Sequence, residues 1–151
     1  MKSCCVTGHR EIAAGKAKYV RQELRREVQK ALQDGITDFY TGMAQGVDLE
    51  FAKIIIAEKA LDARVKLIAA VPYAGRMKTK EPSFHEIIRY CDDVVIICPV
   101  YRKDCYHKRN EYLVEHSDRV IAVFDGREKS GTAMTIRIAQ TKGVETKIIK
   151  I

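Results

Sequence analysis

Six short apolar runs alternate with amphipathic stretches along the 151 residues, and this alternation limits the possible folds more than any other feature. The runs are rich in β-branched, aromatic and other apolar residues, as is typical of parallel strands covered on both faces. Strands that alternate with helices form β-α-β units with right-handed crossovers. The sequence therefore predicts one Rossmann-like α/β domain over residues 1–151, with three layers and a six-stranded, mainly parallel sheet. The expected strands are Lys2–Thr7, Ile36–Thr41, Val65–Val71, Asp93–Cys98, Arg119–Asp125 and Glu145–Ile151.

The stretches between these runs have the residue spacing of amphipathic helices. In the first stretch, Val20, Leu24 and Val28 recur every four positions, and Gly35 follows as a helix-ending residue. In a sheet of this kind, ligands bind outside the carboxyl ends of the strands, where the strand order reverses. The functional residues are therefore expected directly after each strand. The expected helices are Lys16–Asp34, Val47–Ala60, Ser83–Tyr90, Cys105–His116 and Thr132–Lys142.

Charge and cysteine content narrow the classes of partner. The net charge is +7, with 27 Lys and Arg against 20 Asp and Glu, which favours a phosphorylated or polyanionic partner. No apolar run approaches the roughly 18 residues of a membrane helix, and the first apolar run is too short for a signal peptide. We therefore expect a cytoplasmic protein without a membrane partner. The five cysteines include no Cys-x-x-Cys pair and no zinc-like cluster, which predicts buried free thiols, no metal and no cofactor.

The first candidate loop, Thr7-Gly8-His9-Arg10, follows the first strand. Gly8 permits a tight turn with exposed backbone amides, and His9 and Arg10 bring donors suited to a phosphate. The dinucleotide-binding pattern Gly-x-Gly-x-x-Gly is absent, so an ordinary nicotinamide enzyme is not supported. Alone, this loop is equally typical of a simple turn with a solvated arginine.

The second candidate loop runs from Thr41 to Asp48 and contains Gly42, Met43 and Gly46. It opens directly into a helix, so backbone amides and the positive end of the helix are expected to be available for an anion. It is not a Walker loop, because no Lys-Ser/Thr pair follows the second glycine. Asp48 lies in the first helical turn, where it either complements the helix dipole or accepts hydrogen bonds from a ribose hydroxyl or a base edge.

Three further polar segments follow the remaining strands. Pro72-Tyr73 brings a tyrosine that suits base stacking but is as typical of an exposed loop. Residues 99–110 are basic with interleaved tyrosines, a mixture that suits phosphate contact and base stacking, and Arg109-Asn110 lies within an expected helix. Ser130-Gly131-Thr132 opens the last helix, where Thr132 is either a cap or a hydroxyl donor to a phosphate.

Together these motifs resemble the SLOG superfamily, the Rossmann-like group that contains the Smf/DprA proteins and the LOG phosphoribohydrolases, and within it the YpsA-like branch. The resemblance covers nearly the whole chain. It implies a pocket for a nucleotide or nucleotide derivative formed by these loops, usually in a homo-oligomer. The motifs that carry it are Thr7-Gly8-His9-Arg10, Gly42-x-x-x-Gly46-Val47-Asp48, Arg109-Asn110-x-x-Leu113-Val114-x-x-Ser117-Asp118 and Gly131-Thr132-Ala133-x-Thr135.

The chain departs from the enzymatic branch at one position. LOG enzymes resemble it around Gly131-Thr132, but they carry a catalytic glutamate where this chain has Thr135. A hydroxyl cannot replace a carboxylate as a general acid or base at neutral pH. The resemblance therefore favours retention of phosphate binding and weighs against the LOG mechanism.

Three functions remain open. The first is binding of a nucleotide-derived ligand such as ADP-ribose, NAD or a cyclic nucleotide, by a sensor, sequestering or regulatory protein. The second is hydrolysis of a nucleotide N-glycosidic bond, with Asp48 as the candidate catalytic carboxylate. The third is binding of single-stranded nucleic acid, as in Smf/DprA. It would use a basic stripe on the first helix, although two interleaved glutamates favour a solvated face. The residues of that stripe are Arg21, Arg25, Arg26 and Lys30.

Overall fold

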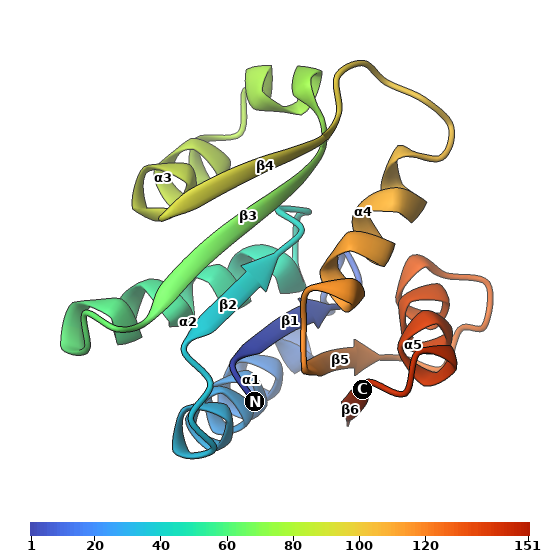
Figure 1. Cartoon of the computed structure of the whole chain (residues 1–151). Coiled ribbons are helices and arrows are strands. Elements are labelled where there is room, and N and C mark those ends of the chain that lie inside the picture. The colour runs from blue at the N-terminus through green and yellow to red at the C-terminus, as the bar shows by residue number, and fades with distance from the viewer.

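The computed structural model describes residues 1–151 and contains one six-stranded sheet. Every pair of neighbouring strands is parallel, and the order across the sheet is β4-β3-β2-β1-β5-β6 (Figure 1). The predicted Rossmann-like α/β architecture is confirmed, and the sheet is parallel throughout. The strands are β1 (Ser3–Thr7), β2 (Asp38–Thr41), β3 (Lys66–Tyr73), β4 (Asp93–Cys98), β5 (Arg119–Phe124) and β6 (Glu145–Lys150).

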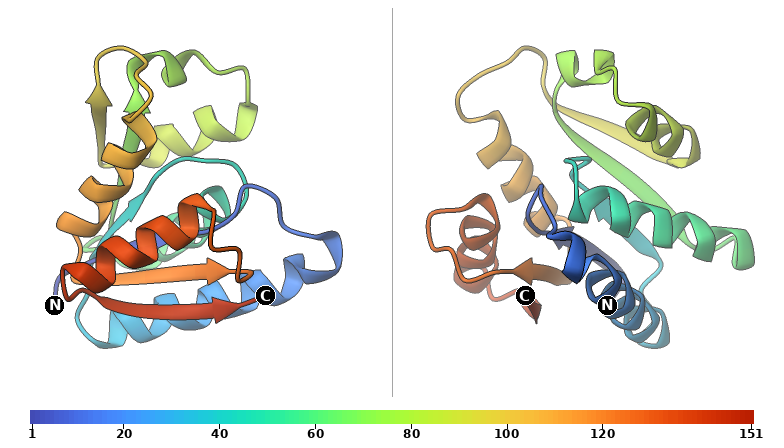
Figure 2. Two further views of the ribbon diagram at one scale, coloured as in Figure 1. Left: turned by 90° about the vertical axis from the view of Figure 1, so that its right-hand side faces the viewer. Right: turned by 180° about the vertical axis from the view of Figure 1, so that it is seen from behind.

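Five α-helices cover the two faces of the sheet. Three of them, α1, α2 and α3, lie on one face, and α4 and α5 lie on the other, as Figure 1 and the two views of Figure 2 show. Two short 3-10 helices precede α1 and α3. The α-helices are α1 (Ala17–Gln33), α2 (Val47–Leu61), α3 (Pro82–Tyr90), α4 (Cys105–Glu115) and α5 (Gly131–Thr141), and the 3-10 helices are η1 (Ala14–Lys16) and η2 (Ala74–Lys78).

The strand order reverses between β1 and β5. From β1 the chain adds β2, β3 and β4 in one direction, and then returns through α4 to place β5 on the other side of β1. Loops that leave β1 and β5 at their carboxyl ends therefore diverge to opposite faces of the sheet. This divergence opens a crevice, which is where ligands bind in doubly wound sheets.

The helix and strand boundaries follow the predicted ones within two residues. The one difference that affects the site is at β3, which continues to Tyr73 instead of ending at Val71. Tyr73 still pairs with Cys98 of the edge strand β4, so the extension is part of the sheet. Helix α3 begins at Pro82, one residue earlier than predicted, because proline has no amide to lose at the first helical position.

The core lies mainly between the sheet and the α1–α3 layer. It contains 24 buried apolar residues, including the predicted α1 stripe of Val20, Leu24 and Val28. The prediction of free thiols is confirmed, and four of the five cysteines are buried. In the central strand β1, burial raises the pKa of Cys5 to about 12, so that thiol stays protonated and packs as an apolar residue. None of the helices has the length and apolar character needed to cross a membrane.

Candidate functional site

Two adjoining cavities open at the carboxyl edge of the sheet. The larger one, here the main cavity, has a volume of about 550 Å³ and lies at the β1/β5 reversal. The smaller one, here the side cavity, has a volume of about 160 Å³ and extends toward α3. Arg10, Ala44, Tyr106 and Arg109 line both. The structure therefore brings most of the predicted site residues together. Those that line the main cavity are Thr7, Gly8, His9, Arg10, Asp48, Arg109, Asn110, Ser130, Gly131 and Thr132.

The amino end of α5 is open to the main cavity. Ser130 caps the helix, because its hydroxyl oxygen accepts a hydrogen bond from the Ala133 amide at 3.1 Å. The two amides between this cap and Ala133, those of Gly131 and Thr132, have no acceptor within the chain. No atom lies within 4 Å of the position that a Gly131 Cβ would occupy. Two free amides at a positive helix end are suited to binding an anion.

His9 joins the loops that follow β1 and β5. Its Nε2 lies 3.1 Å from Asp125 Oδ1, and its Nδ1 lies 3.0 Å from Arg127 Nη2. The Asp125 backbone amide also donates to Nε2 at 3.1 Å, which fits a neutral ring beside the Arg127 charge. Burial, together with the Arg127 charge, lowers the pKa of His9. Both ring nitrogens are therefore engaged by the protein, and the expected donation from His9 to a phosphate is not what the structure favours.

The amino end of α2, where the sequence predicts an anion, is partly occupied by the loop between β1 and α1. The Val47 amide donates to the His9 carbonyl oxygen at 3.3 Å. A Cβ on Gly46 would lie 2.5 Å from the same oxygen and 2.4 Å from that of Arg10. Gly46 lines a separate hollow rather than either cavity. Its lack of a side chain permits the β1–α1 loop to pack closely against the first turn of α2.

Gly8 also permits the loop after β1 to pack against α2. A Cβ at this position would lie 2.5 Å from Val47 Cβ. Gly8 lines the main cavity as predicted, but contact with α2 already requires a glycine here. The absence of a side chain therefore permits loop packing at Gly8 and Gly46, and it leaves open space beside the cavity at Gly131.

Gly42 allows Asp48 and Arg109 to approach each other at the border of the two cavities. A Cβ on Gly42 would lie 2.9 Å from Asp48 Oδ2 and 3.0 Å from Arg109 Nη1. Asp48 Oδ2 accepts from the Ala44 amide at 3.1 Å, and Oδ1 has no hydrogen-bond partner within the chain. Burial raises the pKa of Asp48 from 3.8 to about 6, although Arg109 opposes this rise. The carboxyl group can therefore hold or release a proton near neutral pH.

Arg109 is a buried cation held by neutral acceptors. Its Nη1 donates to the Gly42 carbonyl oxygen at 2.7 Å, and its Nε donates to Asn110 Oδ1 at 2.9 Å. Only 7% of the residue is exposed. Burial lowers the pKa of Arg109, the Asp48 carboxylate opposes this effect, and the charge of Arg10 acts in the same direction as burial. Cations this far from water are normally paired with an anion, so the position suits an anionic ligand.

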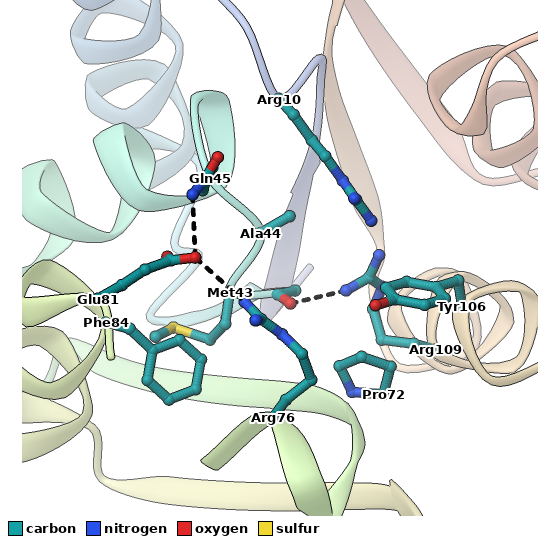
Figure 3. A pocket seen from close by; sticks show the side chains of 11 residues that line it. Arg10, Met43, Ala44, Gln45, Pro72, Arg76, Glu81, Phe84, Tyr106 and Arg109 are labelled. Atoms are coloured by element: carbon teal, nitrogen blue, oxygen red, sulfur yellow. Dashed lines mark hydrogen bonds and ion pairs between the residues drawn. The ribbon is translucent and has the colours of Figure 1, made fainter. Parts of the chain in front are cut away.

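The side cavity contains residues that sequence reasoning did not assign to the site. Figure 3 shows Arg10, Arg76 and Arg109 directed toward one space, with the Tyr106 ring beside it. The Arg10 and Arg109 guanidinium carbons lie 5.2 and 5.5 Å from the centre of the Tyr106 ring. Of these residues, Arg76 follows β3 within η2, so its place after a strand was the available signal. Tyr106 falls in the basic segment whose tyrosines were expected to stack.

Two other predictions at this edge need correction. Pro72 and Tyr73 were expected in a loop, but they are the last residues of β3. Pro72 and Met43 line the side cavity, whereas Tyr73 lines neither cavity. Its ring packs against those of Tyr101 and Tyr106, with centroids 5.2 and 6.3 Å away. The aromatic interaction that Tyr73 was expected to offer a base is therefore made with neighbouring tyrosines.

Thr135 stands apart from both cavities. It is fully buried, and its hydroxyl donates to the Gly131 carbonyl oxygen at 2.9 Å. This hydroxyl stabilises the first turn of α5 and does not face a ligand. No group of three or more His, Cys, Asp or Glu residues lies close enough to hold a metal ion. On the basic stripe of α1, Arg26 and Lys30 pair with Glu23 and Glu27 at 3.7 and 3.6 Å, which partly neutralises it.

Comparisons with known proteins agree with this architecture. In sequence, the chain is 19% identical over 130 residues to a UPF0398 protein of Halalkalibacterium halodurans, a match that covers 82% of this chain and 69% of that protein. In structure, it resembles DNA processing protein A from Helicobacter pylori, a protein described as binding single-stranded DNA. That superposition has a TM-score of 0.70 at 19% identity and covers 97% of this chain. The chain spans 64% of the length of that protein.

A second solved structure, the structural-genomics target TM1055, superposes with a TM-score of 0.61 at 18% identity. This match covers 97% of the present chain and 72% of the other. At such low identity, the two structural matches establish the fold. The model of the YpsA family, described as the YspA SLOG family, matches residues 4–151. This chain therefore belongs to the YpsA family of SLOG proteins.

Proposed function

We propose that this protein binds a nucleotide or nucleotide-derived ligand in the main cavity, and that it acts as a sensor, sequestering or regulatory protein. The open amino end of α5 carries the proposal, because Gly131 and Thr132 present two free amides to a cavity at the strand-order reversal. The volume of about 550 Å³ lies within the range of small-molecule sites. Candidate ligands are ADP-ribose, NAD and cyclic nucleotides, whose phosphates suit a helix amino end.

The remaining groups of the main cavity suit the rest of a nucleotide. Asp48 Oδ1 has no partner within the chain and is available to accept from a ribose hydroxyl or a base edge. Arg10 and Lys129 add positive charge near the free amides of α5. A phosphate at α5 and an acceptor at α2 are the two contacts that orient a nucleotide across the crevice.

Gly131→Val should abolish most of the binding without unfolding the protein. Open space surrounds the position of the missing Cβ, so the side chain would occupy the cavity rather than clash with the fold. We expect the affinity for AMP, measured by isothermal titration calorimetry, to fall about 30-fold, which corresponds to about 2 kcal/mol for lost hydrogen bonds to a charged group.

Gly15→Val is the matched control, because Gly15 also has no atom within 4 Å of its Cβ position but lies in η1, outside both cavities. It should leave the affinity for AMP unchanged. If Gly131→Val and Gly15→Val bind AMP with equal affinity, the phosphate does not bind at the amino end of α5.

Hydrolysis of a nucleotide N-glycosidic bond is the second candidate function, and the raised pKa of Asp48 favours it. A carboxyl group that titrates near pH 6 in a cavity is suited to general acid–base catalysis. Incubation of the protein with AMP, NAD or ADP-ribose, followed by mass spectrometry of the products, separates the two functions. Recovery of unchanged ligand supports a binding protein. Conversion that is lost in Asp48→Ala would establish the enzyme.

Binding of single-stranded nucleic acid is tested in the same titrations by a thymidine oligonucleotide. The likeness to DNA processing protein A supports its inclusion, although that likeness concerns the fold. Nucleic-acid binding would show a steep dependence on salt concentration, because each phosphate contact releases counterions. Saturation by a mononucleotide with a shallow salt dependence would support the main-cavity proposal.

A further inference from the structure

The side cavity is too small for a ligand of its own but large enough for one chemical group. Its volume of about 160 Å³ lies below the range of complete small-molecule sites. It adjoins the main cavity along Arg10, Tyr106 and Arg109, which line both. A ligand seated in the main cavity can therefore extend a single group past the Tyr106 ring into the side cavity.

The charge of the side cavity selects the kind of group. Three guanidinium groups, from Arg10, Arg76 and Arg109, line it against the single carboxylate of Glu81 (Figure 3). Glu81 Oε1 accepts from Gln45 Nε2 at 2.9 Å and lies 4.0 Å from the Arg76 guanidinium. Glu81 therefore balances one of the three cations at most, and the cavity keeps an excess of positive charge.

The arginines also repel one another. The charges of Arg10 and Arg76 both lower the pKa of Arg109, in addition to the larger effect of its burial. The Asp48 carboxylate opposes this effect at Arg109, but repulsion among the three guanidinium groups still favours binding of an anion between them. Guanidinium groups offer paired N–H donors that match the oxygens of a phosphate.

A nucleobase suits this cavity less well than a phosphate. The one fully buried aromatic ring that lines it belongs to Phe84, and the Arg76 guanidinium carbon lies 5.5 Å from the centre of that ring. The guanidinium thus takes the position beside Phe84 that a stacked base would need. Around the opening, the Tyr106 ring contacts two more guanidinium groups. The Phe84 and Tyr106 rings therefore contact the arginine side chains that line the cavity, and they are less available to stack on a base.

From this arrangement we propose that the side cavity is a second phosphate subsite, and that the ligand is a small nucleotide derivative with two phosphate groups, one at the amino end of α5 and one among Arg10, Arg76 and Arg109. The inference rests on the proposed function, because it extends the ligand of the main cavity. Arg76 distinguishes the two sites, since it lines the side cavity and not the main one.

The test compares AMP with two ligands that carry a second phosphate, ADP and adenosine 3′,5′-bisphosphate, by isothermal titration calorimetry. In the unchanged protein, at least one of the two should bind about tenfold more tightly than AMP. Arg76→Gln should remove that gain and leave the affinity for AMP unchanged. Arg89→Gln, an exposed arginine of α3 outside both cavities, is the matched control and should preserve the gain.

Failure of the second phosphate subsite and failure of the proposed function give different results in these titrations. If AMP binds but a second phosphate adds nothing, or if the gain survives in Arg76→Gln, the second subsite is wrong and the main cavity stands. If AMP, the two-phosphate ligands, ADP-ribose, NAD and cyclic nucleotides all fail to bind, the proposed function fails and the subsite fails with it. If a thymidine oligonucleotide binds far more tightly than all three, the ligand is a nucleic-acid strand and the small-molecule assignment is overturned.

Discussion

Gly46→Val should lower the free energy of unfolding by more than about 3 kcal/mol or prevent folding altogether. The added Cβ would lie 2.4 to 2.5 Å from the carbonyl oxygens of Arg10 and His9, and a φ of +79° strains any residue with a side chain. Backbone strain costs about 1–2 kcal/mol and overpacking about 1–3 kcal/mol or more, and the two effects act together here. Urea denaturation followed by circular dichroism measures the loss.

Gly126→Val is the control for backbone strain alone. Gly126 has a φ of +93°, but no atom lies within 4 Å of its Cβ position. Its substitution should therefore cost only about 1–2 kcal/mol. A Gly46→Val protein that folds with normal stability and fails to bind AMP would contradict the account, because it would return the phosphate to the amino end of α2.

Asp48→Asn should stabilise the protein at neutral pH while weakening ligand binding. Burial raises the pKa of Asp48 from 3.8 to about 6, so the folded state disfavours the ionised carboxylate. A shift of about two units corresponds to about 3 kcal/mol of lost stability once the group is ionised in both states. An asparagine amide is neutral and avoids this loss, whereas it cannot replace the carboxylate as an acceptor for two ligand hydroxyls.

The direction of the pH dependence follows from the raised pKa of Asp48. Well below pH 4 the carboxyl is protonated in both the folded and the unfolded state, so Asp48→Asn should change the stability little there. As the pH rises toward 6, the unfolded state loses its proton first and the unsubstituted protein loses stability relative to the variant. Above pH 6 the difference should be complete. Chemical denaturation at pH 4, 5, 6 and 8 measures this profile.

Asp118→Asn is the control of opposite sign. Hydrogen bonds from the Lys2 and Ser3 amides lower the pKa of Asp118, so its ionised form stabilises the folded state. Its substitution should therefore destabilise the protein at neutral pH and have less effect in acid. If Asp48→Asn also behaves in this way, Asp48 is a structural ion-pair partner of Arg109 rather than a carboxylate reserved for a ligand.

The fold could be predicted because each element carries its own signal. The runs that became β1 and β5 are mostly apolar, as is typical of strands buried on both faces, and the α1 stripe has helical spacing. The elements that departed from prediction did so through tertiary contacts. Strand β3 continues through Pro72 to Tyr73 because the edge strand β4 pairs with it, and local sequence does not encode that partner.

The location of the site could be predicted from the sequence, but the roles of its individual residues could not. Parallel topology alone places the loops after β1, β2 and β5 at one edge, and ten predicted residues accordingly line the main cavity. The roles of the glycines depended on what faces them. Gly46 faces the carbonyl oxygens of another loop and Gly131 faces open space, although both precede or begin a helix. Arg76 was missed because η2 brings it back toward Arg109 over a distance that sequence spacing does not reveal.

The most direct test is a titration of ¹⁵N-labelled protein with AMP, followed through backbone amide chemical shifts. The account predicts that the amides of Gly131 and Thr132 shift most, because they are free to donate to the phosphate. The Val47 amide, already bonded to the His9 carbonyl oxygen, should shift little. Shifts centred on Val47, or no shift at the amino end of α5 while AMP binds, would contradict the proposed site.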